Sequence, residues 1–186
     1  SARTKGYAGY SKFDALNSPL LQTLSLDNMW LRLIYTQIVN RCPFHIRPLL
    51  GVKKSRNPKG IALFARAYLF LYSTTRDEFF KTEAEELLQW LIENKAEGAR
   101  YSSWGYNFVW QNTIFVQRRN EPNCVVSVFV GEAFVHAYRL LRDEKYLLVA
   151  RDIANFIIKE LPGLFESRNE MAIGYVKEES DCVVLN

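Results

Sequence analysis

The residues of this chain that could do chemistry gather between Tyr101 and Asn123. Ring, amide and guanidinium side chains alternate there, in a stretch too aromatic for disorder. Rings provide flat apolar surface, amides provide hydrogen-bond donors and acceptors, and arginines bind carboxylates or phosphates in bidentate fashion. A cleft with this lining suits an anionic sugar, a sugar phosphate or a lipid-linked glycan. We predict that substrate binds to Trp104, Tyr106, Asn107, Trp110, Gln111, Arg118, Arg119 and Arg47.

A second polar segment, from Arg41 to Lys59, carries six cationic side chains and no aspartate or glutamate. Its charge of +6 exceeds the +4 of the whole chain, so the cations are concentrated here. The overall pI of 8.9 is too low to indicate a nucleic-acid partner. The alternative to a binding face is that some rings plug the end of a helical core and some cations are simply solvated.

Catalytic groups are harder to find. Glycoside hydrolysis normally uses two carboxylates across a cleft, and no distinctive pair is present. His45 and Glu121 are weak candidates for an acid or base. His136 falls within an apolar segment, where histidine is more often a hydrogen-bonded core residue. The sequence holds neither the cysteine and histidine spacing of a metal site nor a nucleotide-binding motif, so neither a metal nor a cofactor is predicted.

The sequence repeats itself with a shift of 66 residues. An Arg-Asp-Glu triplet at residues 76–78 returns at 142–144, each time between an apolar and an amphipathic segment. The aspartate is expected to cap the second helix, and the glutamate to lie in its first turn, where the helix dipole favours negative charge. Asn57 and Asn123 precede the apolar segments at equivalent places and are expected to cap them.

A third copy of the repeat begins near the last residues. Glu121-Pro-Asn-Cys-Val-Val matches Glu179-Ser-Asp-Cys-Val-Val, which puts Asp181 in the capping position. We therefore expect either a fragment of a longer array, whose second half is missing, or a chain that completes its core with a partner such as another copy of itself. An unfinished core exposes apolar surface, and such surface drives association.

Hydrophobic periodicity predicts the helices of each copy. Ile61 to Ser73 and Val125 to Leu141 are apolar nearly all round, which is typical of helices buried on all sides. Asp77 to Asn94 and Glu144 to Leu161 are amphipathic, as in surface helices with one buried face. The predicted fold class is all-α: antiparallel helical hairpins in two layers, with parallel inner helices, forming one domain over residues 1–186.

Two further helices are predicted after a lead-in over residues 1–17. Ser18 is a plausible N-cap for a short helix from Pro19 to Leu24. Asp27 is expected to cap a helix from Asn28 to Arg41. The apolar face of that helix would consist of Trp30, Leu31, Leu33, Ile34, Ile38 and Val39.

The hairpin repeat, with a Trp-Gly-Tyr-Asn-Phe-x-Trp-Gln stretch at residues 104–111 ahead of an inner helix, resembles the (α/α) toroids. These include the six-hairpin glycosidases, the unsaturated glucuronyl hydrolases and the N-acylglucosamine 2-epimerases, and the chain is most similar to uncharacterised bacterial and archaeal proteins of that shape. The resemblance runs from about Ser18 onward and covers about half of a six-hairpin ring. No catalytic residue can be transferred, because the acids and histidines of the toroid enzymes have no match here.

The resemblance implies a protein that binds or processes an anionic carbohydrate or glycan precursor and, if it is an enzyme, a glycoside hydrolase-like or sugar-modifying one. The alternative function is a non-catalytic helical-repeat scaffold that binds a protein or itself. Three well-separated cysteines and a polar N-terminus predict a reducing, cytoplasmic location. The most apolar stretch, Ile61 to Tyr72, is too short to span a membrane.

Overall fold

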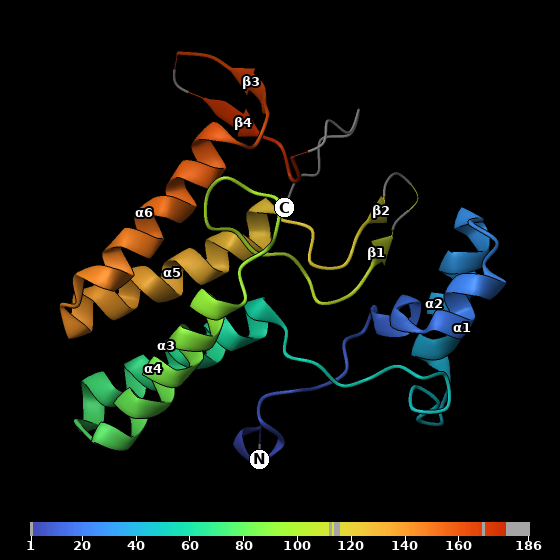
Figure 1. Ribbon diagram of the computed structural model, residues 1–186, viewed down its shortest axis with the longest axis horizontal. Helices are drawn as coiled ribbons and strands as arrows, with labels where there is room; N and C mark the ends of the chain where they lie inside the picture. The colour runs from blue at the N-terminus through green and yellow to red at the C-terminus, as the bar shows by residue number, and fades with distance from the viewer. Residues whose placement is uncertain (1, 112, 114–115, 169, 178–186) are drawn as a thin grey trace. The chain divides into compact units, whose positions relative to one another are not determined.

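Figure 1 shows the computed structural model, which describes residues 2–111, 113, 116–168 and 170–177. In this part of the chain the structure is mainly helical, with six α-helices and two short pairs of strands. The mostly α-helical class is confirmed, and the strand pairs were not predicted. The chain separates into two compact units, Ser1–Asn57 with Tyr106–Asn120 and Pro58–Gly105 with Glu121–Asn186. The single domain expected over residues 1–186 stays a prediction.

The first unit contains the short N-terminal elements. They are η1 (Arg3–Lys5), η2 (Asp14–Asn17), α1 (Pro19–Leu24), α2 (Met29–Arg41) and the antiparallel pair β1 (Trp110–Gln111) and β2 (Val116–Gln117). Ser18 caps α1 as predicted, because its hydroxyl accepts a hydrogen bond from the Leu21 amide. The core of this unit is small and consists of Ala15, Leu21 and Val39, with Tyr35, Ile46 and Leu50 packed against them.

The N-cap of α2 differs from the prediction. Asn28 caps the helix, and its side chain accepts hydrogen bonds from the amides of Trp30 and Leu31. Asp27 has a positive φ of 57° and its carboxylate pairs with Arg32. The predicted cap at Asp27 is therefore wrong by one residue, because that carboxylate is engaged by the arginine side chain.

The apolar face predicted for α2 is also wrong in part. Trp30, Ile34 and Ile38 are 61%, 50% and 55% exposed. Thr36 and Val39 are the buried positions of this helix, and Val39 belongs to the core of the unit. Helix α2 therefore has two apolar stripes. The one with Tyr35 and Val39 packs on the core of the unit, and the one with Trp30, Ile34 and Ile38 is exposed.

Four longer helices form two hairpins in the second unit. They are α3 (Pro58–Thr75) with α4 (Glu78–Glu93), and α5 (Cys124–Leu141) with α6 (Glu144–Lys159), followed by the antiparallel strands β3 (Gly163–Glu166) and β4 (Met171–Ile173). Figure 1 shows α3 and α5 packed along each other, each with its own partner helix. A shift of 66 residues carries both ends of α3 and α4 onto the ends of α5 and α6, which confirms the predicted repeat.

The turns of the two hairpins repeat as closely as their helices. Each contains an arginine with φ near 60°, an aspartate whose carboxylate accepts a hydrogen bond from the amide two residues on, and a tyrosine hydroxyl bonded to a glutamate. The residues are Arg76, Asp77, Tyr72 and Glu78 in the first turn, and Arg142, Asp143, Tyr138 and Glu144 in the second. Hydrogen bonds from Lys145 hold the pKa of the Asp143 carboxyl below its ordinary value. The capping role predicted for these aspartates is confirmed.

Helix α5 begins at the predicted cap. The Asn123 side chain accepts a hydrogen bond of 2.8 Å from the Val126 amide. The Asn123 amide in turn donates to the carbonyl of Trp104, and the Cys124 amide donates to the carbonyl of Tyr175. The start of α5 is therefore tied to the segment before it and to the one that follows β4.

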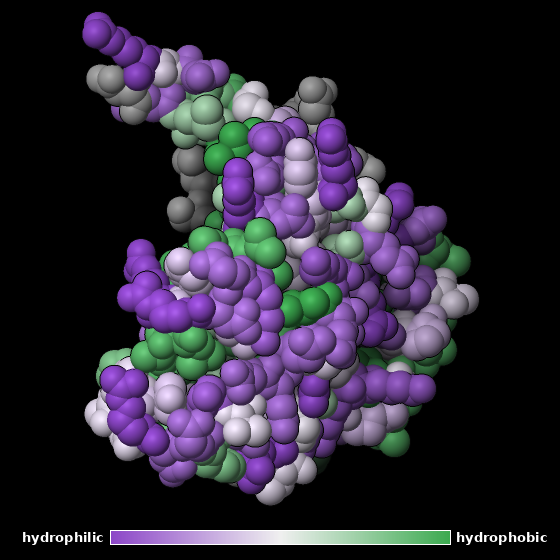
Figure 2. Space-filling model, turned by 60° about the vertical axis from the view of Figure 1, so that its left-hand side comes forward, coloured by the Kyte–Doolittle hydropathy of each residue, from purple (hydrophilic) through white to green (hydrophobic). Residues whose placement is uncertain are grey.

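The two inner helices run parallel, as predicted (Figure 1). Arg66 of α3 forms an ion pair with Glu132 of α5, and these two residues are equivalent positions of the repeat. The expectation that both helices are buried on all sides is wrong, because Phe70 is 64% exposed and Val128 is 38% exposed. Each inner helix packs on its outer helix and on the other inner helix, and its remaining side stays open. Figure 2 shows apolar patches between the hydrophilic side chains on the face that it draws.

Helix α5 has the length and composition of a membrane-spanning helix, with a mean hydropathy of 1.5 over 18 residues. Core helices of soluble proteins satisfy the same criteria, and α5 packs against α3 and α6. The third copy predicted at residues 179–184 lies outside the described residues, as do Asp181 and Cys182.

Candidate functional site

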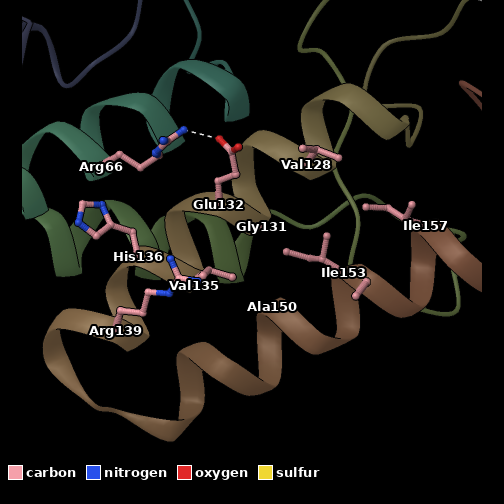
Figure 3. Close-up of a pocket in the computed structure, with 11 residues that line it drawn as sticks. Arg66, Val128, Gly131, Glu132, Val135, His136, Arg139, Ala150, Ile153 and Ile157 are labelled. Carbon is pink, nitrogen blue, oxygen red and sulfur yellow. Dashed lines mark hydrogen bonds and ion pairs between the residues drawn. The ribbon is translucent and has the colours of Figure 1, made fainter. Parts of the chain in front are cut away.

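A groove runs between α5 and α6 of the second hairpin. Its volume is about 450 Å³, and it is open to solvent along its length. Figure 3 shows α5 and α6 contributing its two walls, with Arg66 reaching it from α3. Its lining comprises an apolar floor of Val128, Gly131, Val135, Ala150, Ile153, Ala154 and Ile157, and a polar rim of Arg66, Glu132, His136 and Arg139. We call the floor the open flank of the second hairpin.

The open flank corresponds to buried core in the first hairpin. Shifted back by one repeat, its residues fall on Ala62, Ala65, Leu69, Ala84, Leu87, Leu88 and Leu91. All of these are 2% exposed or less, because α5 packs over α3 and touches α4. On the open flank only Ile153 is as buried, whereas Val128 and Ala154 are exposed. The same positions of the repeat are therefore buried core in the first hairpin and solvent-accessible surface in the second.

Gly131 sets how closely the two walls of the groove approach. A β-carbon at this position would lie 3.3 Å from Cγ2 of Ile153, so the absence of a side chain lets α6 pack against the α5 backbone. The equivalent residue in the first hairpin is Ala65, which is fully buried. A small residue is thus present at the helix crossing in both copies.

The rim of the groove combines cations with a neutral base. Glu132 is held by Arg66, and Figure 3 shows His136 and Arg139 projecting from α5 further along the same rim. Burial, and then the positive charges of Arg66 and Arg139, lower the pKa of the His136 imidazole below its ordinary value. At neutral pH this histidine is therefore a neutral hydrogen-bonding group beside two guanidinium groups.

Trp104 was predicted to bind substrate, and in the structure it lies in the core of the second unit. It is 1% exposed, and its indole N–H donates to the carbonyl of Leu91 over 3.0 Å. Its backbone amide donates to the Ser127 hydroxyl of α5 over 3.1 Å. Its ring also lies 6.3 Å from that of Phe134. Trp104 therefore helps to close the flank of the first hairpin.

The other predicted rings and amides lie in the first unit and pack on their neighbours. The Tyr106 ring stacks on Phe108 with centroids 4.9 Å apart, and meets Trp110 edge-on at 6.3 Å. The Asn107 amide donates to the Ser55 hydroxyl, and the Gln111 amide donates to the carbonyl of Met29. These four predicted residues thus lie in the same unit, and the side-chain N–H groups of Asn107 and Gln111 are hydrogen-bonded within it.

The predicted cations of the first unit have different surroundings. Arg47 donates to the buried Asp14 carboxylate over 2.7 Å and also reaches the Asn40 side chain. Arg118 and Arg119 are exposed. Arg47 thus stabilises the fold of the unit, whereas Arg118 and Arg119 lie at its surface.

The weak candidates for acid–base chemistry occupy different units. His45 belongs to the first unit, is exposed and packs edge-on against the Tyr10 ring at 4.7 Å. Glu121 belongs to the second unit and is half-buried. Among the described residues, no group of three histidine, cysteine, aspartate or glutamate side chains is placed to hold a metal ion.

The sequence analysis predicted exposed apolar surface but did not place it between α5 and α6, although the repeat contains the signal that locates it. The second copy keeps apolar or small residues at all seven positions of the open flank, and no helix in the described part of the chain follows α6 to cover them. No protein-family model, curated protein or solved structure matches the chain, so its function is inferred from its own geometry.

Proposed function

We propose that this chain is a helical-repeat scaffold that binds a further helical hairpin on the open flank of α5 and α6. The observation that carries this proposal is the difference in burial between equivalent positions. Leu69 and Leu91 are fully buried in the first hairpin, whereas their counterparts Val135 and Ile157 line an open groove. A surface made of core-type residues gains free energy when another apolar surface covers it.

The size of that gain supports a protein partner. Full burial of a valine- or isoleucine-sized side chain contributes about 1.5–3 kcal/mol. The part of this gain still to be made lies mainly at Val128, Val135 and Ile157, since Ile153 is already buried. A helix laid along the groove would touch all three side chains at once, as α5 does at the equivalent positions of the first hairpin.

The (α/α) toroid is the larger architecture within this proposal. One step of the repeat carries α3 and α4 onto α5 and α6, and the same step repeated would put a third hairpin on the open flank. Continued stacking of this kind gives a ring or an extended array. The proposal agrees in this respect with the resemblance of the repeat to the toroid proteins.

A peptide with the sequence of residues 121–143 is a suitable probe for the open flank, because it copies the helix that covers the first hairpin. The full chain should bind this peptide saturably in fluorescence anisotropy. Val128→Glu should abolish binding by placing a charge on the groove floor. Leu148→Glu is the matched control, since Leu148 is 63% exposed on α6 and lies outside the groove. Equal binding by both variants would contradict the proposal.

A second proposed function, binding of an anionic carbohydrate, is supported by two side chains of the first unit. Asn107 and Gln111 are 7% and 8% exposed, and their amide oxygens accept no hydrogen bond in the structure. A buried acceptor without a donor costs about 1–3 kcal/mol, and a sugar hydroxyl is such a donor. The exposed Arg118 and Arg119 belong to the same unit and would pair with an acidic group on the glycan.

Glycan-array binding tests this second function. The wild-type chain should bind acidic glycans, and Trp110→Ala should remove binding. Trp30→Ala is the matched control, because Trp30 is 61% exposed in the same unit and is not among the predicted site residues. Absence of binding by the wild-type chain would overturn this function and leave the scaffold proposal intact.

A further inference from the structure

Two partly exposed apolar surfaces of the second unit correspond, by the repeat, to the two sides of its own α3–α5 contact. The first is the open flank. The second is a stripe on α3 whose equivalents on α5 are buried: Gly60, Phe64, Ala67 and Leu71, equivalent to Val126, Val130, Ala133 and Ala137. The four α5 residues are 0% exposed, whereas Phe64 and Leu71 are each 39% exposed. These positions are spaced at four, three and four residues, so they form one face of the helix.

Burial therefore distinguishes two faces on every inner helix. In α3 the covered face contains Ala62, Ala65 and Leu69, and in α5 the buried face is the one that contains Val130 and Ala137. Ala65 and its equivalent Gly131 mark the side of each inner helix that faces its own outer helix. We assign the other buried positions, Ala62 and Leu69 of α3 and Val130 and Ala137 of α5, to the contact between the two inner helices, because α3 and α5 pack on each other. The chain thus leaves exposed a copy of each side of its own α3–α5 interface.

We propose that the open flank of one molecule binds α3 of a second copy of this chain, in the way that α5 packs on α3 and α4 within one copy. This inference rests on the proposed scaffold function and specifies its partner. Because the two surfaces differ, the contact is head-to-tail, and each added copy presents a fresh open flank. Association would therefore proceed beyond the dimer, to a ring or an open stack.

The charges on the two surfaces also complement each other. Within one copy, Arg66 on the covered helix pairs with Glu132 on the covering helix. In the proposed contact Glu132 belongs to the covered helix, and Arg66 of the second copy occupies the equivalent place on the covering helix. Arginine and glutamate would then alternate along the stack, without a pair of like charges at this position.

Sedimentation velocity with two single variants tests the head-to-tail contact. The mass of the wild-type chain should rise above 21.6 kDa with concentration. Val128→Glu blocks the open flank and Leu71→Glu blocks the α3 stripe, so each variant alone should stay monomeric. An equimolar mixture should form a dimer that grows no further, because one intact flank meets one intact stripe. Leu148→Glu should associate like the wild type.

Circular dichroism of each variant shows whether it is folded, so a loss of association is not confused with unfolding. Association that persists in both variants would overturn the head-to-tail contact, as would a mixture of folded variants that stays monomeric. A wild-type chain that stays monomeric at high micromolar concentration would also overturn it. If that monomer still bound the peptide of residues 121–143 at Val128, the scaffold function would stand without self-association.

Discussion

The two hairpins of the second unit share their helix boundaries, turns and caps, yet they differ in what covers them. The flank of the first hairpin is core, and the same flank of the second is a groove. The difference is not in the apolar character of the residues, since both copies keep it at all seven positions. It arises from the next inner helix, which the first hairpin has in α5. Whether a given position of this repeat is buried thus depends on whether a neighbouring hairpin packs over it, as in other helical arrays.

The connecting segments sharpen this comparison. Trp104 precedes α5 and packs into the flank of the first hairpin, where its indole binds the carbonyl of Leu91. One repeat later the equivalent residue is Glu170, which is exposed beside β4. The first flank is therefore closed by a helix and a tryptophan, and the second has a glutamate at the position of that tryptophan.

The largest expected effect follows from removing the tryptophan. Trp104→Ala should lower the free energy of unfolding by about 3–5 kcal/mol, because it empties a fully buried site and removes one of the two hydrogen bonds to the Leu91 carbonyl. Urea unfolding followed by circular dichroism measures this loss. Trp30→Ala, at an exposed tryptophan of the first unit, should change the free energy by only about 0.5 kcal/mol. Losses of equal size would contradict the core role of Trp104.

A matched pair of truncations tests the covered and open flanks directly. Leu91 and Ile157 are equivalent positions, and each loses the same number of carbon atoms on mutation to alanine. Leu91→Ala should cost about 2–5 kcal/mol, since Leu91 is fully buried. Ile157→Ala should cost less than half as much, because its side chain is already partly in water. The measurement is urea unfolding at low micromolar concentration, which limits association between chains.

Equal costs in this pair would mean that the open flank is covered in solution. Repeating the Ile157→Ala experiment at high concentration extends the test. If a second copy covers the flank, the cost of Ile157→Ala should rise with concentration, while that of Leu91→Ala stays constant. A cost of Ile157→Ala that does not change with concentration would count against coverage by another copy.

The sequence predicts much of the second unit because its signals are local. The 66-residue shift, the apolar periodicity and the Arg-Asp-Glu triplets are enough to place α3 to α6, and the Asn123 cap follows from the residue type. The triplets and the Asn123 cap act within one turn of helix, and the apolar periodicity acts within one helix. These local signals therefore predict the helices independently of the tertiary contacts that the rest of the chain makes.

The sequence is less informative wherever the outcome depends on a distant partner. Trp30 and Trp104 are the same residue type, yet one is 61% exposed and the other 1%. The position of an apolar ring in the sequence is the same whether the ring lines a cleft or fills a core. The core role of Trp104 depends on its contact with Leu91, thirteen residues earlier, which the sequence does not show. The open flank is a similar case. Apolar periodicity shows which side chains would be stabilised by burial, but not whether another helix packs over them.

The smallest expected effect concerns His136 on the groove rim. His136 is equivalent to Phe70, so only the second hairpin carries an ionisable group at this position. Burial and two nearby arginines lower the pKa of His136 in the folded state, whereas the unfolded chain has the ordinary value of 6.5. Between the folded and unfolded pKa values the unfolded chain binds more protons, so the stability of the protein should fall as pH decreases below 6.5. His136→Gln removes this contribution and should flatten the dependence of the urea midpoint on pH between 6.5 and the lower folded pKa of His136. An unchanged slope in the variant would mean that His136 is as well solvated in the folded chain as in the unfolded one, and that the groove rim is more open than its geometry indicates.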